Sequence, residues 1–396
     1  MRIKEVRAAP IRRPEAIFLN WTPNEPDHRR PGGGGPKDLW DWANPMSRYP
    51  KVKADRSLWR LSPDRNVACI VTAEDGTWGF GSTSYEGSVV PIINEQFAPV
   101  LIGEECMATE KLWDMMYRMT SPYGPGLGNC AMSAVDIALW DLKGKLLGRP
   151  VYELLGGPAR EKVICYASGN NTEWNMELGF KATKLFCPAG PADGLAGLDA
   201  NEELVSRTRD LVGTGVELML DCWMALDVEF AVRLAERLRP YDLKWMEDCL
   251  MPEDLDGYVE LRKRIPWQSL GTGEHWFSIL PFFSATSRRI AEVLQPDVNW
   301  VGGITAVVKI CHYAEAAGIS VIPHCGGNVA EGQHLALAMP SMPWAEFGPG
   351  APNVPLVESF RRFPGTVVPE SGCLVPSNAP GLGLDISKGD LEMALT

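Results

Sequence analysis

The sequence predicts an α/β fold in which a barrel of alternating strands and helices is joined to a smaller α+β domain. From about residue 162, short apolar runs alternate with helical stretches, and the runs end at positions 168, 186, 221, 247, 274, 297, 324 and 347. The steps from Asp221 to His324 are 26, 27, 23 and 27 residues long. Eight strand–helix units at this spacing are typical of a parallel (β/α)₈ barrel.

A doubly wound open sheet is the alternative architecture. Such a sheet rarely needs eight strand–helix units. Neither GxGxxG nor GxxxxGK[ST], the glycine-rich turns that bind phosphate in those folds, follows any of the predicted strands. The barrel is therefore favoured.

The first 125 residues have a different order, with strands followed by helices. Strands are expected over 1–11 and 66–83, the second region turning at the EDG of 74–76, and helices over 109–119 and 132–148. Residues 22–37 are dense in Pro and Gly and are expected to form a long mobile loop, a common form for a lid. We expect an α+β capping domain over 1–125, the barrel over 126–355, and a C-terminal segment over 356–396 that packs back on the capping domain.

Composition excludes several classes of function. The chain has 38 Lys and Arg against 50 Asp and Glu, for a net charge of −12, so it lacks the basic face that a nucleic-acid partner requires. It has no 18-residue apolar stretch and no signal-peptide core at its start, so we expect a cytoplasmic protein without a membrane partner. The ten cysteines occur singly, without CxxC or CxxH pairs, and are expected to be reduced thiols.

Three successive predicted strands end in carboxylates, at Asp221, Glu247 and Glu274. The carboxyl ends of barrel strands converge on one mouth, where three carboxylates repel one another unless a cation lies between them. An all-oxygen set of ligands selects a hard ion, so Mg²⁺ is the expected cofactor, with Mn²⁺ as the alternative. A helix cap would explain one acid alone, such as Asp248, but explains three in consecutive strands less well.

The remaining strand ends supply groups for proton transfer and charge stabilisation. Asp297 and His324 end the next two strands, and a carboxylate beside a histidine fixes its tautomer and makes it a stronger base. Lys184, on the second strand, is placed to hold a substrate carboxylate beside the metal. Glu346, on the eighth strand, is expected to be a protonated hydrogen-bond donor, because the crowded carboxylates would raise its pKa.

At these residues the sequence resembles the enolase superfamily, and within it the mandelate racemase subgroup. The similarity to its L-rhamnonate dehydratase family, an acid-sugar dehydratase family, lies in the blocks LMLDCWMALD, LKWMEDCL, TGEHW, LQPDVNWVGG, VIPH, NPMSRY and PGLGLDI. The resemblance implies a (β/α)₇β TIM-type barrel with an α+β capping domain formed by the N-terminal region and the C-terminal tail. It also implies a homo-oligomer, a dimer or an octamer.

The resemblance assigns roles to the residues at the barrel mouth. It implies that Asp221, Glu247 and Glu274 bind Mg²⁺. It implies that His324 is the general base, with Asp297 as its carboxylate partner. Glu346 is implied to be the electrophile on the enolate side. Lys184 matches the first lysine of the subgroup's second-strand pair, while Phe186 stands in place of the second.

The missing lysine favours one reaction class over another. A racemase needs an acid–base group on each face of the α-carbon, whereas a dehydratase can remove the proton and expel the hydroxyl on one face. We therefore expect a hydro-lyase that abstracts the C2 proton of a sugar acid and eliminates the C3 hydroxyl, giving a 2-keto-3-deoxy acid. A racemase or epimerase of a 2-hydroxy acid remains an alternative, because His275 could supply a second acid, and so does a non-catalytic barrel that only binds.

The capping loops are expected to choose the substrate. Arg56 aligns with a cap arginine of the rhamnonate family, His28 lies in the Gly-rich loop where the family places a substrate histidine, and His275 is a third candidate for substrate binding. The stretch LFCPAGP and the tryptophans at 40 and 42 depart from the family pattern. L-Lyxonate and L-mannonate therefore stand beside L-rhamnonate as candidate substrates.

Overall fold

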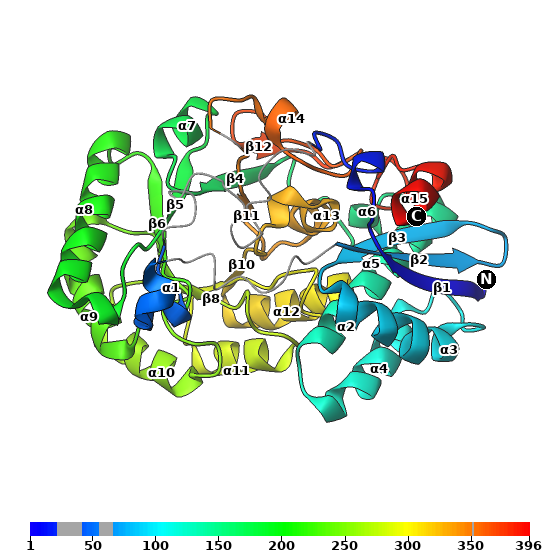
Figure 1. The fold of residues 1–396 in the computed structure, drawn as a ribbon, viewed down its shortest axis with the longest axis horizontal. Coiled ribbons are helices and arrows are strands. Elements are labelled where there is room, and N and C mark those ends of the chain that lie inside the picture. The colour runs from blue at the N-terminus through cyan, green and yellow to red at the C-terminus, as the bar shows by residue number, and fades with distance from the viewer. Residues whose placement is uncertain (22–41, 55–65, 351) are drawn as a thin grey trace.

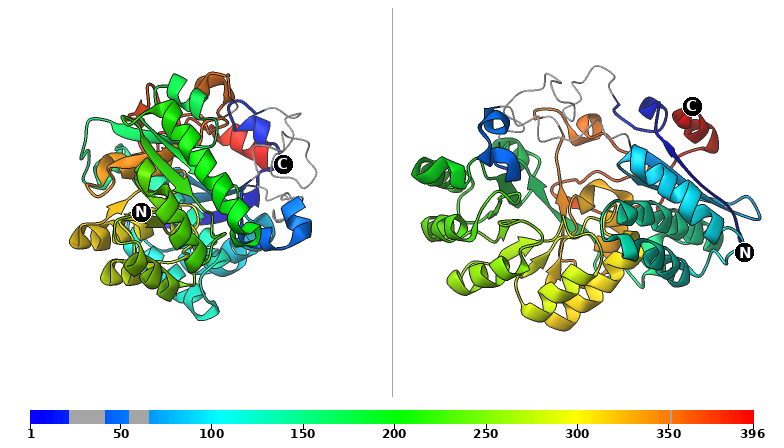
Figure 2. Two further views of the ribbon diagram at one scale, coloured as in Figure 1. Left: turned by 90° about the vertical axis from the view of Figure 1, so that its left-hand side faces the viewer. Right: turned by 60° about the horizontal axis from the view of Figure 1, so that its bottom comes forward.

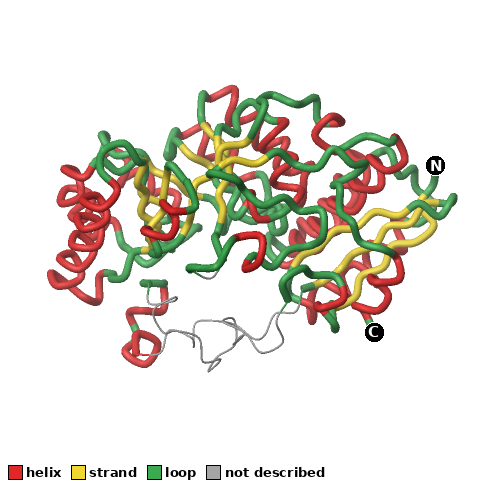
Figure 3. The backbone as a smooth tube through the Cα atoms, turned by 90° about the horizontal axis from the view of Figure 1, so that it is seen from above, coloured by secondary structure: helices red, strands yellow, loops and turns green. Residues whose placement is uncertain are grey.

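The computed structural model describes residues 1–21, 42–54, 66–350 and 352–396 (Figure 1). An antiparallel sheet lies at one side of the molecule, and a larger curled parallel sheet with its helices forms the rest. Both chain termini lie beside the antiparallel sheet (Figure 1). Figure 3 shows the two sheets as separate groups of strands. A short helix, α1 (Pro50–Ala54), lies between two segments that the structure does not describe.

The capping sheet has three antiparallel strands in the order β1 (Ile3–Pro10), β2 (Val67–Ala73) and β3 (Trp78–Thr83). The hairpin predicted at the EDG sequence is confirmed, since β2 and β3 pair directly and Gly76 has a φ of 88° there. Helices α2 (Glu86–Pro91), α3 (Ala98–Leu101) and α4 (Thr109–Thr120) follow the sheet.

Helix α5 (Leu127–Leu147) packs directly on strands β2 and β3. Two glycines allow this close approach, because a Cβ at Gly79 or Gly81 would lie about 2 Å from a carbonyl oxygen of α5. The helix begins five residues before the predicted start at 132 and stops at Gly148, a left-handed residue with a φ of 63°. The main helix on the capping sheet thus lies after residue 125, in the range expected for the barrel.

The barrel sheet contains eight parallel strands, which lie between residues 163 and 347. From β4 to β10 each strand pairs in parallel with the next in the chain, and the last strand, β11, pairs in parallel with the first, β4. Between β10 and β11 the amide of Val321 donates to the carbonyl oxygen of Ser341 at 2.9 Å. The strands are β4 (Val163–Ser168), β5 (Ala182–Phe186), β6 (Glu217–Asp221), β7 (Met246–Glu247), β8 (Leu270–Thr272), β9 (Val293–Leu294), β10 (Ser320–Val321) and β11 (Trp344–Phe347).

Helices cover the outer face of this sheet, as Figure 2 shows. They are α6 (Val151–Leu154), α7 (Thr172–Glu177), α8 (Gly194–Val212), α9 (Val228–Leu238), α10 (Leu255–Arg264), α11 (Leu280–Arg288), α12 (Gly303–Ala317) and α13 (Ala330–Ala338). The predicted TIM-type barrel is confirmed. The open-sheet alternative is wrong, because β11 pairs with β4 on one side and the segment leading into β11 is hydrogen-bonded to β10 on the other.

The barrel interior is packed with side chains rather than hollow. A buried cluster comes from residues in or directly next to six of the strands and comprises Tyr166, Ala182, Met219, Trp245, Val293 and Ile322. The rings of Tyr166 and Trp245 meet edge to face at 5.5 Å. This apolar layer lies next to the polar residues at the strand ends, since the Lys184 ammonium is 5.9 Å from the Tyr166 ring.

The C-terminal tail returns to the capping sheet. It contains α14 (Leu356–Ser359), β12 (Cys373–Leu374), which pairs with β4, and α15 (Lys388–Leu395). Leu391 and Ala394 of α15 are buried in a cluster with Ile11 and Phe80. The carboxylate of Asp141 on α5 joins these parts, because it accepts the amides of both Phe80 and Leu382 at 2.8 Å.

Within the described ranges, no helix is both long and apolar enough to cross a membrane. All ten cysteines lie in these ranges as free thiols, as the sequence predicts.

We predict that His334 makes the fold sensitive to acid. Its Nδ1 accepts the Tyr152 amide at 3.2 Å, and its Nε2 lies 3.3 Å from the Leu382 carbonyl, so the neutral ring links α13 to α6 and to the tail. Burial lowers the pKa of His334 to about 4. Its stabilising contribution is complete above the unfolded-state pKa of about 6.5 and is lost as pH falls towards 4.

The expected loss from this histidine between pH 7 and pH 5 is about 2 kcal/mol of unfolding free energy. Chemical denaturation at both pH values measures it. His334→Gln should show a correspondingly smaller loss, while the exposed His312→Gln should keep the wild-type pH dependence. Equal losses in all three proteins would contradict the prediction.

Candidate active site

The polar strand ends gather at the carboxyl end of the barrel. Phe186, Asp221 and Glu247 occupy neighbouring register positions on β5, β6 and β7. Glu274 follows β8 by two residues, and Asp297 and His324 each follow their strands by three. The structure therefore brings together the groups that the sequence places at one mouth.

Asp221, Glu247 and Glu274 are at most 5% exposed, and a carboxylate oxygen from each lies within 4.8 Å of the others. Burial is the largest cause that raises the pKa of Asp221 to about 7 and of Glu247 to about 8, and it also raises the pKa of Glu274. Three desolvated acids with oxygen ligands directed at one point fit a hard divalent cation.

Lys184 provides the positive charge next to this cluster. Its side chain is 1% exposed. The ammonium contacts Glu247, lies 2.7 Å from an oxygen of Glu346, and is 3.5 Å from Asp221. Burial lowers the pKa of Lys184, but the surrounding carboxylates outweigh it and hold the pKa well above its ordinary value. The ammonium is therefore charged and lies directly beside the carboxylate cluster.

Two neutral donors orient Glu247. The indole Nε1 of Trp245 donates to Oε2 at 2.9 Å, and the amide of Gln295 donates to the same oxygen at 2.6 Å. This leaves Oε1 for Lys184. Trp245 precedes Glu247 by two positions, and Gln295 precedes Asp297 by two. Because side chains alternate along a strand, each donor is expected on the same side of the sheet as the site residue that follows it. This signal was not used in predicting the site from the sequence.

His324 and Asp297 form the predicted dyad. Nδ1 of His324 lies 2.8 Å from Oδ2 of Asp297, whose other oxygen accepts the Asn299 amide at 2.7 Å. This contact places the ring proton on Nδ1, so Nε2 is the basic nitrogen. Nε2 lies 3.7 Å from an oxygen of Glu274, within reach of anything bound at the carboxylates.

Charged neighbours change the pKa of His324. Burial alone lowers it, but Cys325, Glu274 and the hydrogen bond to Asp297 raise the pKa well above its ordinary value. The indole of Trp300 lies 5.4 Å from the imidazole ring.

The prediction that Glu346 is a protonated donor is wrong. One oxygen accepts from Ser168 Oγ and from the Lys184 ammonium, and the other accepts the Cys325 amide at 2.9 Å. Burial raises the pKa of Glu346, but the opposing effects of Lys184 and His324 are larger and lower the pKa to about 2. Crowding by carboxylates does not keep Glu346 protonated, because its nearest charged neighbour is the ammonium of Lys184.

The other predicted residues have different outcomes. His275 lies in the site, with Nδ1 3.1 Å from Asp248 and 3.3 Å from Glu274. The cap role considered for Asp248 is wrong, because Asp248 binds the Thr272 hydroxyl at 2.6 Å, and α10 is capped instead by Asp254. The two cap-loop candidates, His28 and Arg56, lie outside the described residues.

Aromatic side chains surround the end of β5, where Phe186 replaces a lysine of the resembled subgroup. The Phe186 ring lies 4.5 Å from that of Trp42, which in turn lies 5.6 Å from that of Trp223. This side of the mouth is therefore apolar.

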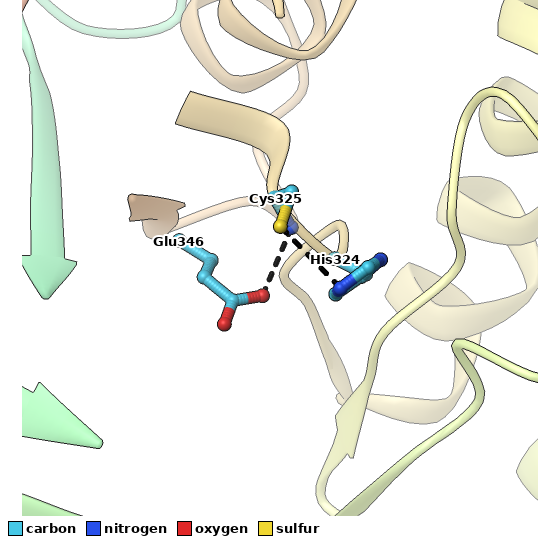
Figure 4. Close-up of side chains that lie close together, drawn as sticks. All are labelled: His324, Cys325 and Glu346. Carbon is cyan, nitrogen blue, oxygen red and sulfur yellow. Dashed lines mark hydrogen bonds between the residues drawn. The ribbon is translucent and has the colours of Figure 1, made fainter. Parts of the chain in front are cut away.

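Cys325 and Ser168 are contacts that the sequence reasoning did not single out. The Cys325 thiol lies 3.3 Å from Nε2 of His324, and its amide binds Glu346 (Figure 4). Cys325 directly follows the predicted base, His324, and Ser168 ends the first barrel strand. These positions in the sequence could have indicated that both residues lie at the barrel mouth.

Comparison with known proteins gives the same picture as the geometry. The model of the mandelate racemase / muconate lactonizing enzyme N-terminal domain matches residues 53–156, and the enolase C-terminal domain-like model matches residues 171–390. The chain belongs to the enolase superfamily, as its sequence motifs imply.

Individual relatives are more specific. The chain is 42% identical over 307 residues to an L-rhamnonate dehydratase of Saccharopolyspora erythraea, covering 77% of this chain and 78% of the relative. It is 37% identical over 351 residues to a putative L-rhamnonate dehydratase of Caldivirga maquilingensis, covering 87% of each. The crystal structure of rhamnonate dehydratase from Gibberella zeae complexed with Mg superimposes with a TM-score of 0.87 at 28% identity, covering 99% of this chain and 95% of that one.

We predict that Glu247→Gln weakens Mg²⁺ binding by at least ~10-fold, because it removes one anionic ligand. Isothermal titration calorimetry of Mg²⁺ into the purified protein measures the change. The matched control is Asp136→Asn, which alters a buried carboxylate that binds Thr305 away from the cluster and should leave Mg²⁺ affinity unchanged. Equal affinities of wild type and Glu247→Gln would rule out Glu247 as a ligand.

Proposed function

We propose that this chain is a Mg²⁺-dependent dehydratase of a sugar acid of the L-rhamnonate type. It abstracts the C2 proton and eliminates the C3 hydroxyl to give a 2-keto-3-deoxy acid. The observation that carries the proposal is the His324–Asp297 dyad, whose basic nitrogen lies 3.7 Å from one of three clustered carboxylates. The relatives named L-rhamnonate dehydratase place the chain among lyases, and the Mg-complexed relative supports magnesium as its metal.

The metal and one lysine select a carboxylate substrate. Asp221, Glu247 and Glu274 would hold Mg²⁺, which when bound supplies the positive charge that offsets the charge developing on the substrate carboxylate. The Lys184 ammonium, 3.5 Å from Asp221, binds the same C1 carboxylate from the β5 side. Both groups favour a small anion despite the net charge of −12 of the whole chain.

His324 carries the proton in both half-reactions. Nε2 removes the C2 proton, and the electron pair of the C–H bond moves towards C1 to form an enediolate. Asp297 stabilises the resulting imidazolium through Nδ1. The imidazolium then returns the proton to the C3 hydroxyl as the C3–O bond breaks, so water leaves. The enol product loses the proton of its C2 hydroxyl and takes up a proton at C3, and so becomes the 2-keto-3-deoxy acid.

The environment of Phe186 favours elimination over racemisation. An aromatic wall of Phe186, Trp42 and Trp223 occupies the side from which a second lysine would act. The second candidate function is epimerisation of a 2-hydroxy acid, which the position of His275 beside Glu274 supports. In that case, substrate recovered from D₂O would carry deuterium at C2 with inverted configuration.

The capping loops complete the substrate assignment. We propose that His28, Arg56 and His275 bind the hydroxyl-bearing part of the sugar acid. L-Rhamnonate, L-lyxonate and L-mannonate are the candidate substrates. The homo-oligomer, the cytoplasmic location and the absence of a nucleic-acid partner stay predictions.

We predict Mg²⁺-dependent dehydration of at least one of these three acids. The assay incubates the full chain with each acid and Mg²⁺ and identifies the product by ¹H NMR. Omission of Mg²⁺ is the control and should abolish turnover. Failure with all three acids would contradict the substrate class while leaving the metal site unaffected.

We also predict that His324→Asn lowers kcat by about 10²- to 10⁴-fold, because it removes the general base. Deuterium exchange at C2 should disappear together with dehydration. The control is His312→Asn, on the exposed face of α12, which should retain wild-type rates. A His324→Asn protein that still exchanges the C2 proton would contradict the assigned base.

A further inference from the structure

Three side chains next to the carboxylate cluster offer a second, different set of metal ligands. Ligand atoms of His324, Cys325 and Glu346 all lie within 4.8 Å of one another (Figure 4). The thiol of Cys325 is 3.3 Å from Nε2 of His324. The cluster therefore presents sulfur, nitrogen and oxygen together, whereas the Mg²⁺ ligands present oxygen alone.

We propose that His324, Cys325 and Glu346 form a binding site for a borderline divalent ion such as Zn²⁺, distinct from the Mg²⁺ site. Zn²⁺ favours tetrahedral sites made of thiolate, imidazole and carboxylate, whereas Mg²⁺ favours oxygen. Tetrahedral Zn–S and Zn–N bonds of ordinary length separate sulfur from nitrogen by about 3.5 Å. The observed separation of 3.3 Å needs little adjustment.

The ligands are held in place by contacts around them. One oxygen of Glu346 is fixed by Ser168 and Lys184, and the other accepts the amide of Cys325. The backbone of Cys325 has a φ of 49°, a left-handed conformation that few residues other than glycine adopt. Nδ1 of His324 binds Asp297, which directs Nε2 towards the thiol.

Charge and access also suit a cation. A thiolate and a carboxylate balance the two charges of Zn²⁺, while the ring of His324 is a neutral ligand. The ammonium that shares Glu346 is also paired with Glu247 and Asp221. The side chain of His324 is 22% exposed and Cys325 is partly exposed, so an ion can reach the site and keep water as its fourth ligand.

Occupation of this site would inhibit the enzyme. The lone pair of Nε2 that binds Zn²⁺ is the one that accepts the C2 proton, so a zinc-bound His324 cannot act as a base. Zn²⁺ thus inhibits without displacing Mg²⁺. This consequence rests on the proposed function, whereas the site itself does not.

Cobalt absorption tests the site without using activity. Co²⁺ titrated into the full chain in excess Mg²⁺ should produce a thiolate-to-cobalt charge-transfer band that saturates at one equivalent. Cys325→Ser should abolish the band. Two variants should keep the band: Cys373→Ser, which changes another partly exposed cysteine, and Glu247→Gln, which changes the carboxylate cluster but none of the three proposed ligands. His324→Asn, a second variant within the site, should weaken Co²⁺ binding by at least ~10-fold.

A missing band in the wild type, or a band that survives Cys325→Ser, would overturn the site. Loss of the band in Glu247→Gln would also overturn it, because the ion would then occupy the Mg²⁺ ligands.

Inhibition of turnover tests the consequence separately. In saturating Mg²⁺, half-inhibition of Cys325→Ser should need at least ~10-fold more Zn²⁺ than half-inhibition of wild type, each measured against its own uninhibited rate. If cobalt binds through Cys325 but Zn²⁺ leaves dehydration unaffected, the inhibitory role is wrong and the site stands. If no sugar acid is dehydrated, the proposed function fails while the cobalt result still decides the site.

Discussion

The buried ammonium of Lys184 is the interaction on which the rest of the site depends. It touches carboxylates from three strands, Asp221, Glu247 and Glu346, in a region where its own side chain is 1% exposed. Carboxylates brought out of water at such short range strongly oppose folding unless a cation compensates them. Lys184 supplies part of that compensation from the protein itself, and it also sets the low pKa of Glu346.

Much of the fold and site follows from the sequence because a parallel barrel has few degrees of freedom. Once eight strand ends are recognised, the carboxyl ends must meet at one mouth, so Asp221 and Glu247 become neighbours without any knowledge of contacts. The His324–Asp297 contact follows for the same reason, since their strands are adjacent.

The sequence does not predict properties that depend on side-chain direction and distance. Glu346 was expected to be neutral, but its charge state depends on Lys184, which approaches to 2.7 Å from β5, the second strand away in the sheet. The two donors to Glu247, Trp245 and Gln295, follow from alternation only when the strand register is known. The packing of α5 on the capping sheet depends on Gly79 and Gly81, whose significance appears only when the helix lies against them.

The most direct test of the account is a crystal structure of the protein with Mg²⁺ and a sugar acid that binds without turning over. The account predicts one ion bound by Asp221, Glu247 and Glu274, with the acid's carboxylate beside Lys184 and its C2 facing Nε2 of His324. An ion bound by other residues, or a C2 atom that faces away from His324, would contradict it.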